Sequence, residues 1–500
     1  MADTKREIER KYEATTDTRV PDLTEVRGVS RVVDAGTADL DAVYYDTPDL
    51  RLAAHSLTLR RRTGGNDAGW HLKLPVAPGV RDEIRAPLGD DVPRGLAGLV
   101  RARTRGEDLV PLMRLLSSRD VHHLVDADGA VLAELSTDTV RAERLTDGGG
   151  TAEWAEIEVE LADGADVSLL DAVDTRLRKA GLRPAAAPSK LARALEETGT
   201  APPARTPSPY ETAGDHVLAY LREQVDTLLD LDAGVRRDQP DSVHQMRVAT
   251  RRLRSAFRSH RKVLDRSVTD PVAEELKWLA AELGVDRDQE VLEERLRTAL
   301  DTVPRPLLLG PVRGRLRRWS AARRAGSRGR TLKVLDSARY LRLLDSLDAL
   351  LTDPPLRPAA AKDPARVLAK AVLKDHARVA ARVEHALSLD PGKDRDVALH
   401  EARKAAKRAR YAAELASPAL GKPAKRLAKR MKAVQQVLGD HQDSVVAREA
   451  LRNLAAQAHA AGESAFTWGL LYAREESAAA ARERELPDVW AEVSVRGLRP

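Results

Sequence analysis

The chain of 500 residues contains no cysteine, which excludes disulfide bonds and thiolate metal sites. Aromatic residues make up only 3% of it, so the stacking platforms of many nucleic-acid binders are missing. The chain also has no apolar run of about 18 residues, the length that a membrane-spanning helix needs. Its charged start lacks the apolar core of a signal peptide. These absences predict a cytoplasmic protein with no membrane partner and disfavour nucleic acid as a ligand.

Charge is distributed unevenly along the chain. Residues 1–200 hold 28 Lys and Arg against 36 Asp and Glu, whereas residues 201–500 hold 55 against 41. The formal net charge of the whole chain is +6. An acidic first part and a basic second part indicate two separate tasks. The basic part predicts a polyanionic partner.

Short alternating runs dominate the first part, and turn residues separate them, which predicts an antiparallel sheet or barrel. If residues 7–11 form a strand, Glu7, Glu9 and Lys11 point to one face at intervals of about 7 Å. Carboxylates of this kind suit Mg²⁺ or Mn²⁺, and the amine suits a phosphate. The alternative is a solvated strand face.

Later strands supply further polar rows of the same kind. One row joins Arg60 with Arg62, and another joins Arg81 with Glu83. In the last row, three glutamates at 156, 158 and 160 alternate with apolar residues, and like charges so arranged repel unless cations face them. A closed barrel would bring all the rows into one lumen, where acids hold a cation and bases hold phosphates. An ordinary sheet with a wet outer face is the other interpretation.

The ordered set of motifs resembles the CYTH domain, the triphosphate tunnel metalloenzyme superfamily. The match begins with Glu7-x-Glu9-x-Lys11, continues through Tyr45-Asp46-Thr47-Pro48 and Leu59-Arg60-x-Arg62, and ends at Ser189-Lys190. The resemblance implies an eight-stranded antiparallel tunnel that cleaves or rearranges triphosphates with Mg²⁺ or Mn²⁺.

Site residues follow from the resemblance by position. It implies metal binding by Glu7, Glu9, Asp138, Glu156, Glu158 and Glu160, and catalytic roles for Lys11 and Tyr45. It implies triphosphate binding by Lys11, Arg60, Arg62, Lys73, Arg81, Arg119 and Lys190. Two departures stand out: Arg119 is a single base where relatives often have two or three, and Arg85 replaces a second acid after Glu83.

A Pro-rich stretch at 199–209 predicts a stiff linker between the domains. Beyond it, residues 210–497 show helical periodicity and an internal duplication. The segment that starts at Val243 returns at Leu399 with an offset of 156, and Leu283-Gly284 returns as Leu438-Gly439. Two copies of one helical bundle are therefore expected, at about 210–350 and 364–497.

The duplicated segment places cations on one stripe of a helix in each copy. No acids lie along the stripe, so it is either a solvated basic face or a polyanion site. The segment resembles the CHAD domain, a helical module associated with inorganic polyphosphate. The resemblance implies polyphosphate binding by His244, Arg247, Arg251, Arg254, Arg258, Lys277, His400, Arg403, Lys407, Arg410, Lys429 and Lys432.

Together these patterns predict an α+β protein of two domains: an antiparallel barrel with flanking helices at 1–198, then an all-α domain of two pseudo-symmetric bundles. The leading hypothesis is a metal-dependent triphosphatase that also binds polyphosphate and associates with polyphosphate granules. A non-catalytic adaptor, an adenylyl cyclase and a nucleic-acid binder are the alternatives.

Overall fold

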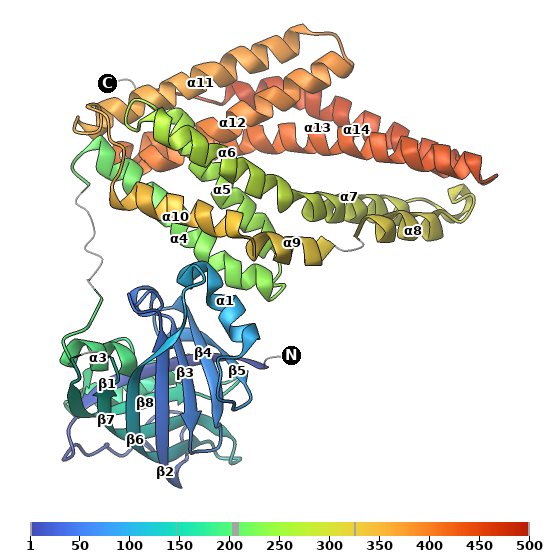
Figure 1. The fold of residues 1–500 in the computed structure, drawn as a ribbon. Coiled ribbons are helices and arrows are strands. Elements are labelled where there is room, and N and C mark those ends of the chain that lie inside the picture. The colour runs from blue at the N-terminus through green and yellow to red at the C-terminus, as the bar shows by residue number, and fades with distance from the viewer. Residues whose placement is uncertain (1–2, 147, 203–209, 325–326, 499–500) are drawn as a thin grey trace. The chain divides into compact units, whose positions relative to one another are not determined.

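The computed structural model describes residues 3–146, 148–202, 210–324 and 327–498. The chain divides into two compact units, residues 1–206 and 207–500 (Figure 1). The first unit is a β-barrel with helices and the second is all-helical, which confirms the predicted α+β class. Within the predicted linker, residues 203–209 lie outside the described part of the chain.

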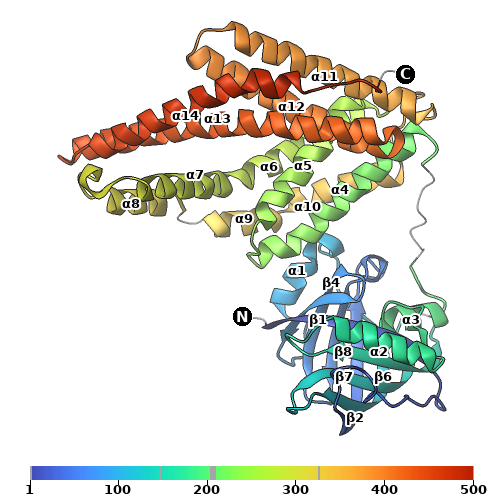
Figure 2. The ribbon, with the colours of Figure 1, turned by 180° about the vertical axis from the view of Figure 1, so that it is seen from behind.

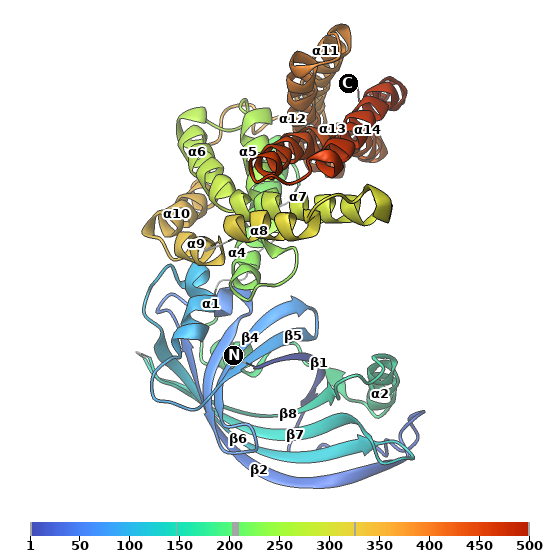
Figure 3. The ribbon, with the colours of Figure 1, turned by 90° about the vertical axis from the view of Figure 1, so that its right-hand side faces the viewer.

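Eight antiparallel strands form the barrel, in the order β5-β4-β3-β2-β6-β7-β8-β1 (Figure 3). Strand β1 closes the ring because its first half, from Asp3 to Ile8, pairs with β5 and its second half, from Glu9 to Ala14, pairs with β8. The short strand β9 (Arg183–Pro184) adds to β1. The barrel strands are β1 (Asp3–Ala14), β2 (Arg31–Asp46), β3 (Thr58–Thr63), β4 (Gly69–Ala77), β5 (Val80–Ala86), β6 (Val110–Val125), β7 (Val131–Arg144) and β8 (Thr151–Leu161).

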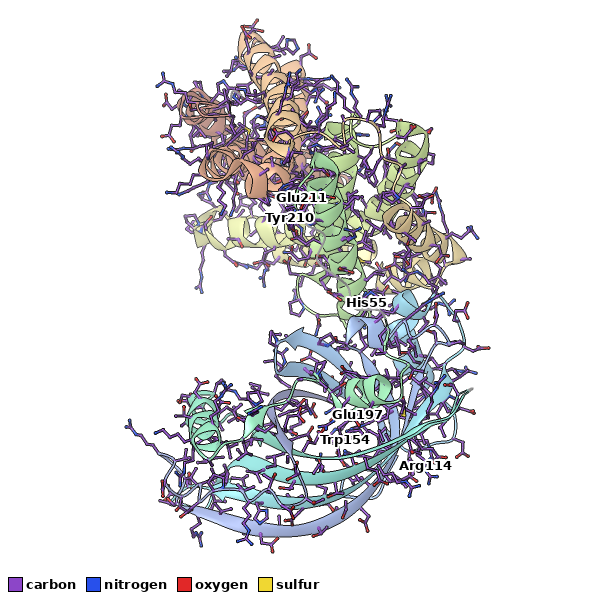
Figure 4. All side chains as sticks on the ribbon, turned by 90° about the vertical axis from the view of Figure 1, so that its left-hand side faces the viewer. His55, Arg114, Trp154, Glu197, Tyr210 and Glu211 are labelled. Carbon is purple, nitrogen blue, oxygen red and sulfur yellow. The ribbon has the colours of Figure 1, made fainter. Side chains whose placement is uncertain are left out.

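Three helices cover the barrel. Helix α1 (Arg94–Thr104) packs on the apolar face of β3–β5 around Trp70, and α2 (Ser168–Lys179) packs on that of β1, β7 and β8. Helix α3 (Lys190–Glu197) packs instead on residues of β7 and β8 whose side chains face the lumen, among them Trp154, and Figure 4 shows that residue beside the helix. The period-two alternation of the strands thus gives two apolar outer patches and a lumen that is apolar only where α3 lies.

The second unit consists of two helical bundles built from repeated elements. Helices α6 and α7 of the first copy meet at Leu283, and their counterpart in the second copy is the single continuous helix α13. The first copy comprises α4 (Ala213–Arg236), α5 (Ser242–Ser259), α6 (Arg266–Glu282), α7 (Gly284–Asp301), α8 (Val312–Arg324), α9 (Ser327–Leu335) and α10 (Ala338–Thr352). The second comprises α11 (Pro364–Ser388), α12 (Lys393–Leu420), α13 (Lys422–Ala460) and α14 (Phe466–Ala491).

Antiparallel neighbours pack along the chain, and α13 and α14 run side by side in both views of the bundle (Figures 1 and 2). The two copies join where α5 packs against α12, and again where Leu296 and Leu300 of α7 meet Trp468 and Leu471 of α14 in one core. None of the helices in the described ranges combines the length and hydrophobicity that crossing a bilayer requires.

Candidate functional site

A cavity of about 650 Å³ occupies the barrel lumen and is lined by charged side chains of both signs. We call it the barrel cavity. Strand alternation carries the polar rows of all the walls inward, as the sequence patterns predict. Of the residues predicted for this site, the cavity wall contains Glu7, Glu9, Lys11, Arg60, Arg62, Lys73, Arg81, Arg119, Glu158, Glu160 and Lys190.

The acidic wall comes from two neighbouring strands. In the β1–β8 pairing Glu9 lies opposite Glu160, and Lys11 lies opposite Glu158. The Lys11 ammonium is 3.2 Å from Glu9 and also contacts Glu158. Burial disfavours the charged form of Glu9, but Lys11, Lys73 and Arg81 together outweigh it, so the pKa of Glu9 is lowered.

Glu7 lies one step further along the same row and is nearly buried, with 3% of its surface exposed. Its carboxylate is 2.6 Å from the Lys73 ammonium. Burial nevertheless raises the pKa of Glu7, and the nearby carboxylates of Glu83 and Glu160 add to the rise. Glu7 therefore lies in a buried group of carboxylates, with Lys73 as its direct partner.

A second acidic cluster lies behind the cavity wall, around the first residue of α3. The Lys190 ammonium is 2.9 Å from Asp138, 2.7 Å from Glu156 and 2.7 Å from Glu158. Ser189 caps the helix, since its side chain accepts a hydrogen bond from the backbone N–H of Ala192. The cap fixes the start of α3, and with it the position of Lys190. Asp138 and Glu156 are buried here rather than in the cavity wall.

Arg119 links the two acidic groups. Its guanidinium donates to both Asp138 oxygens, at 2.7 and 2.8 Å, and to Glu158 at 2.8 Å. Burial works against the charge, but the carboxylates of Asp138 and Glu158 together outweigh it and raise the pKa of Arg119. Arg119 of β6 is therefore a fixed cation that bridges a carboxylate of β7 and one of β8.

The opposite wall is cationic. Arg60 donates to the hydroxyl of Tyr44 at 3.3 Å and lies 3.8 Å from Glu83. Burial, together with the neighbouring charges of Arg60 and Arg119, lowers the pKa of Arg62 to about 9. Mutual repulsion among three guanidinium groups makes this the part of the lumen where an anion would be most stabilised.

The structure corrects the prediction for Tyr45. Its ring packs against Trp70 with centroids 4.9 Å apart, in the apolar cluster that α1 covers. The tyrosine in the cavity wall is its neighbour Tyr44. Tyr44 lies opposite Arg60 in the β2–β3 pairing, and Tyr45 faces the other side of the sheet because side chains alternate along a strand.

Sequence analysis also missed cavity residues that carry charge. Glu134 of β7 lies opposite Glu160 in the β7–β8 pairing and lines the cavity, as does Lys5 of β1. Period two from Glu7 would have identified Lys5. Glu134 gives no such signal, because Ser136 separates it from Asp138 along the inward row of its strand.

The donor set suits a hard divalent cation. Glu7, Glu9, Glu158 and Glu160 bring carboxylate oxygens to one wall from adjacent strands, and such oxygens are the ligands that Mg²⁺ and Mn²⁺ prefer. Burial, and then the carboxylates of Glu83 and Glu160, raise the pKa of Glu7, and a bound cation would favour its charged form. The oxygens of Asp138, Glu156 and Glu158 also lie within 4.8 Å of one another, but the Lys190 ammonium already contacts all three.

In the helical unit, the duplicated stripes meet where α5 packs on α12. We call Arg247, Arg251, Arg403 and Lys407 the basic seam. All four side chains are half-buried. Burial and the charges of Arg403 and Arg251 lower the pKa of Lys407 to about 7. The seam therefore concentrates positive charge between the copies.

Acids that the sequence pattern did not place beside the stripes contact two of their members. Arg247 donates to both oxygens of Asp288, at 2.8 and 3.1 Å, and Arg403 lies 3.9 Å from Asp443. Asp288 and Asp443 close the duplicated motifs that begin at Leu283 and Leu438. The two motifs thus position the two arginines.

The other residues predicted for polyphosphate lie around the seam. Arg254 and His400 are half-buried, and burial lowers the pKa of each. Arg410 donates to Glu414 at 2.8 Å, and Lys277 pairs with Glu274 at 2.9 Å. The remainder lie on α5, where His244 is half-buried and Arg258 exposed, or on α13, where Lys429 and Lys432 are exposed.

Comparisons with known proteins agree with this geometry. The CYTH domain family matches residues 5–195, and the CHAD domain family matches residues 219–452. The uncharacterized protein Rv2226 of Mycobacterium tuberculosis is 41% identical over 486 residues, which cover 94% of this chain and 92% of that protein.

Two solved structures resemble the helical part. PptA from Streptomyces chartreusis is 23% identical with a TM-score of 0.49, and the match covers 56% of this chain and 100% of that chain. The CHAD domain from the plant Ricinus communis is 25% identical with a TM-score of 0.44, and the match covers 58% of this chain and 92% of that one. The two family matches and the full-length relative show that this chain belongs to the proteins in which a CYTH domain is followed by a CHAD domain.

Proposed function

We propose that the barrel hydrolyses triphosphates, or the ends of polyphosphate chains, and that the helical domain binds inorganic polyphosphate. The observation that carries this proposal is the barrel cavity, where a carboxylate wall faces a guanidinium wall inside one lumen. A triphosphate chain needs cations along its length, and its cleavage needs charge neutralisation at the phosphoryl group in transfer. Both are available within the same cavity.

Each wall has a distinct task in this proposal. Arg60, Arg62 and Arg119 bind phosphate oxygens, and the bound anion relieves the repulsion among them. Lys11 and Lys73 hold the carboxylates of Glu9 and Glu7 in place. A divalent cation on the carboxylate wall would supply charge neutralisation and an acidified water ligand. Tyr44 orients Arg60 through the hydrogen bond that its hydroxyl accepts.

The test is phosphate release from tripolyphosphate with Mg²⁺, with Mn²⁺ and with chelator. Glu9→Gln removes one cavity carboxylate charge while keeping the side-chain size. The matched control is Glu153→Gln, a change on the same strand as Glu158 at a side chain that is 71% exposed. We expect metal-dependent release that Glu9→Gln abolishes and Glu153→Gln preserves.

A non-catalytic adaptor is the second candidate, and one observation favours it: Glu7, Glu9 and Glu158 each contact at least one cationic side chain. Such a barrel would bind a triphosphate without cleaving it. No release from tripolyphosphate or ATP, and no cyclic AMP from ATP, together with retained tripolyphosphate binding, would identify the adaptor.

Polyphosphate binding by the helical domain is tested at the basic seam. Arg251→Glu reverses one charge beside Lys407, and we expect long-chain polyphosphate to bind this variant at least about tenfold more weakly, since a cation becomes an anion. Recruitment to polyphosphate granules would depend on the same residue. Arg474, exposed on α14, provides the charge-reversal control.

A further inference from the structure

A second cavity, of about 1090 Å³, lies in the helical domain between the end of α5, the start of α6 and helix α11. We call it the α11 cavity. Four of its cations lie on or just before α11, at intervals of one turn: Lys362, Arg366, Lys370 and Lys374. Arg258, the last cation of the α5 stripe, lines the same cavity.

The cations of this row are not neutralised by protein groups. Among the described residues, Lys362, Arg366, Lys370 and Lys374 form no side-chain ion pair, although acids also line the cavity. Those acids have other partners. Asp375 accepts from Ser259 at 2.5 Å and pairs with Arg378 and Arg408. Asp270 pairs with Arg266, Glu274 pairs with Lys277, and Asp363 accepts the backbone N–H of Arg366 as the cap of α11. Stacked like charges repel, so the row has a net attraction for an anion.

His260 gives the second, independent observation. It lies in the cavity wall, is 1% exposed, and neither ring nitrogen has a hydrogen-bond partner. Burial lowers its pKa to about 4, so the ring is neutral and has one donor and one acceptor. An ionised inorganic phosphate chain has only acceptors and can pair with the N–H alone, whereas a hydroxyl group is donor and acceptor and can pair with either ring nitrogen.

The pseudo-symmetry of the two copies relates the α11 cavity to a second cavity, and the residues that line the two cavities differ. Arg252 of α5 lies 3.5 Å from Gln224 of α4, just as Arg408 of α12 lies 3.1 Å from Asp375 of α11. Gln224 and Asp375 stand at equal distances from the helix caps, Thr212 and Asp363.

At the matching positions, the counterpart has Tyr220 and Glu223 of α4 in place of Ala371 and Lys374 of α11, and Glu414 of α12 in place of Arg258 of α5. This counterpart cavity measures about 280 Å³. The bundle fold therefore requires neither the size nor the charge of the α11 cavity.

We propose that the α11 cavity binds a nucleoside polyphosphate, a ligand whose phosphoryl groups are carried by a hydroxyl-bearing frame with an apolar face. The lysine and arginine row takes the phosphates, and His260 takes a hydroxyl group. Val263, Val367 and Ala371, which also line the cavity, contact the apolar face. The site is separate from the barrel cavity and from the basic seam, and the proposal does not rest on either.

Lysine footprinting of the full chain tests the proposal, with ATP as the probe and chelator present to prevent turnover. We expect ATP to slow acylation of Lys370 and Lys374 about tenfold at 90% occupancy, while Lys422 and Lys425, exposed at the start of α13, react at an unchanged rate. Barrel occupancy is read separately at Lys73. The same experiment is repeated with tripolyphosphate, and we expect tripolyphosphate to protect Lys370 and Lys374 only at a higher concentration than ATP does.

Charge reversal locates the site. Lys370→Glu combined with Lys374→Glu should remove the protection of Lys362 by ATP, whereas Lys422→Glu combined with Lys425→Glu should preserve it. Circular dichroism shows whether each variant keeps its helices. The proposal is overturned if ATP leaves Lys370 and Lys374 unprotected in the wild type, or if tripolyphosphate protects them at the same concentration as ATP. Either result can be obtained whether or not the barrel hydrolyses triphosphates.

Discussion

The guanidinium group of Arg247 lies directly against Gly284, where an added Cβ would come within 2.9 Å of Nη2 and 3.1 Å of Cζ. The second copy repeats the relationship, because a Cβ on Gly439 would lie 3.3 Å from Nη2 of Arg403. The glycine common to both motifs therefore makes room for an arginine of the basic seam. The aspartate that ends each motif then pairs with that arginine: Asp288 with Arg247, and Asp443 with Arg403.

Gly284→Ala should displace Arg247 without unfolding the domain, because the obstructing atoms are the far end of a flexible side chain. We expect long-chain polyphosphate to bind about threefold more weakly, the loss of part of one charge-assisted contact. Alanine in place of a helical glycine raises the unfolding free energy by about 1 kcal/mol, which offsets the cost of moving the arginine. Gly439→Ala, where the approach is less close, is the matched comparison and should affect binding less. A larger binding defect in Gly439→Ala would contradict this account.

Polyphosphate binding should weaken as the pH rises above 7. Burial, Arg403 and Arg251 lower the pKa of Lys407 to about 7, and Asp443 only partly opposes them. A bound polyanion favours the ammonium form, so binding takes up a proton, and affinity falls by up to about tenfold per pH unit above the pKa. In the free protein the unfolded chain binds more protons between pH 7 and 10.5, so this lysine makes stability rise with pH across that window.

Lys407→Arg provides the control, because arginine stays charged throughout the range. Affinity for long-chain polyphosphate measured from pH 6 to 9 should lose most of its slope in this variant. Calorimetry in two buffers of different ionisation enthalpy measures the proton uptake directly. Equal slopes for wild type and variant would assign the pH dependence to other groups.

Tyr44→Phe should lower triphosphate turnover about tenfold, since a hydrogen bond to a charged group contributes roughly 1.5–3 kcal/mol and Tyr44 accepts one from Arg60. Tyr45→Phe should leave turnover unchanged because its ring packs on Trp70 outside the cavity. Initial rates and KM for both variants separate the two residues. The reverse order of effects would place Tyr45, and not Tyr44, at the reacting groups.

Lys190→Met should destabilise the barrel, because it leaves three carboxylates without the ammonium that contacts them. Breaking a buried ion pair costs about 3–5 kcal/mol. The unpaired carboxylates would then bind protons more readily in the folded state, so the defect should shrink as the pH falls. Urea unfolding at pH 5 and 8 measures both effects. Lys179→Met, at an exposed residue of α2, is the control.

The same variant tests the acidic cluster for metal affinity. With Lys190 absent, Asp138, Glu156 and Glu158 lose their common cation, and a divalent cation could take its place beside Arg119, which still contacts Asp138 and Glu158. Mn²⁺ should therefore raise the melting temperature of Lys190→Met more than that of the wild type. Equal shifts would mean that this cluster does not bind the metal.

Period-two alternation was sufficient to predict most of the barrel cavity. Glu7, Glu9 and Lys11, and likewise Arg60 and Arg62, lie on inward rows because a strand has no other way to arrange alternate side chains. The structure differs at Tyr45, which was assigned from the family motif: Tyr44 lies opposite Arg60 on the inward row, so alternation turns Tyr45 outward. Asp138 and Glu156 share inward rows, yet they are covered by Lys190, whose position depends on the packing of α3.

In the helical domain the sequence indicated the stripes and the duplication, but not the acids or the α11 cavity. Asp288 reaches Arg247 from another helix, and such a contact depends on how helices cross. The cations of α11 recur at every fourth residue, which is also the pattern of an ordinary solvated helix face. What distinguishes them is the hollow beside them and the buried His260, and both arise from packing.

The pairing of β1 with both β5 and β8 has a consequence for how this protein forms during synthesis. β1 leaves the ribosome before β8, so Glu9 cannot meet Glu160 until the whole of β8 has been made. Until then both edges of the sheet stay open, and open edges recruit strands from other chains. Closing the ring joins segments far apart in the chain and is intrinsically slow. Conditions that delay translation of β8 should therefore favour aggregation of the nascent barrel.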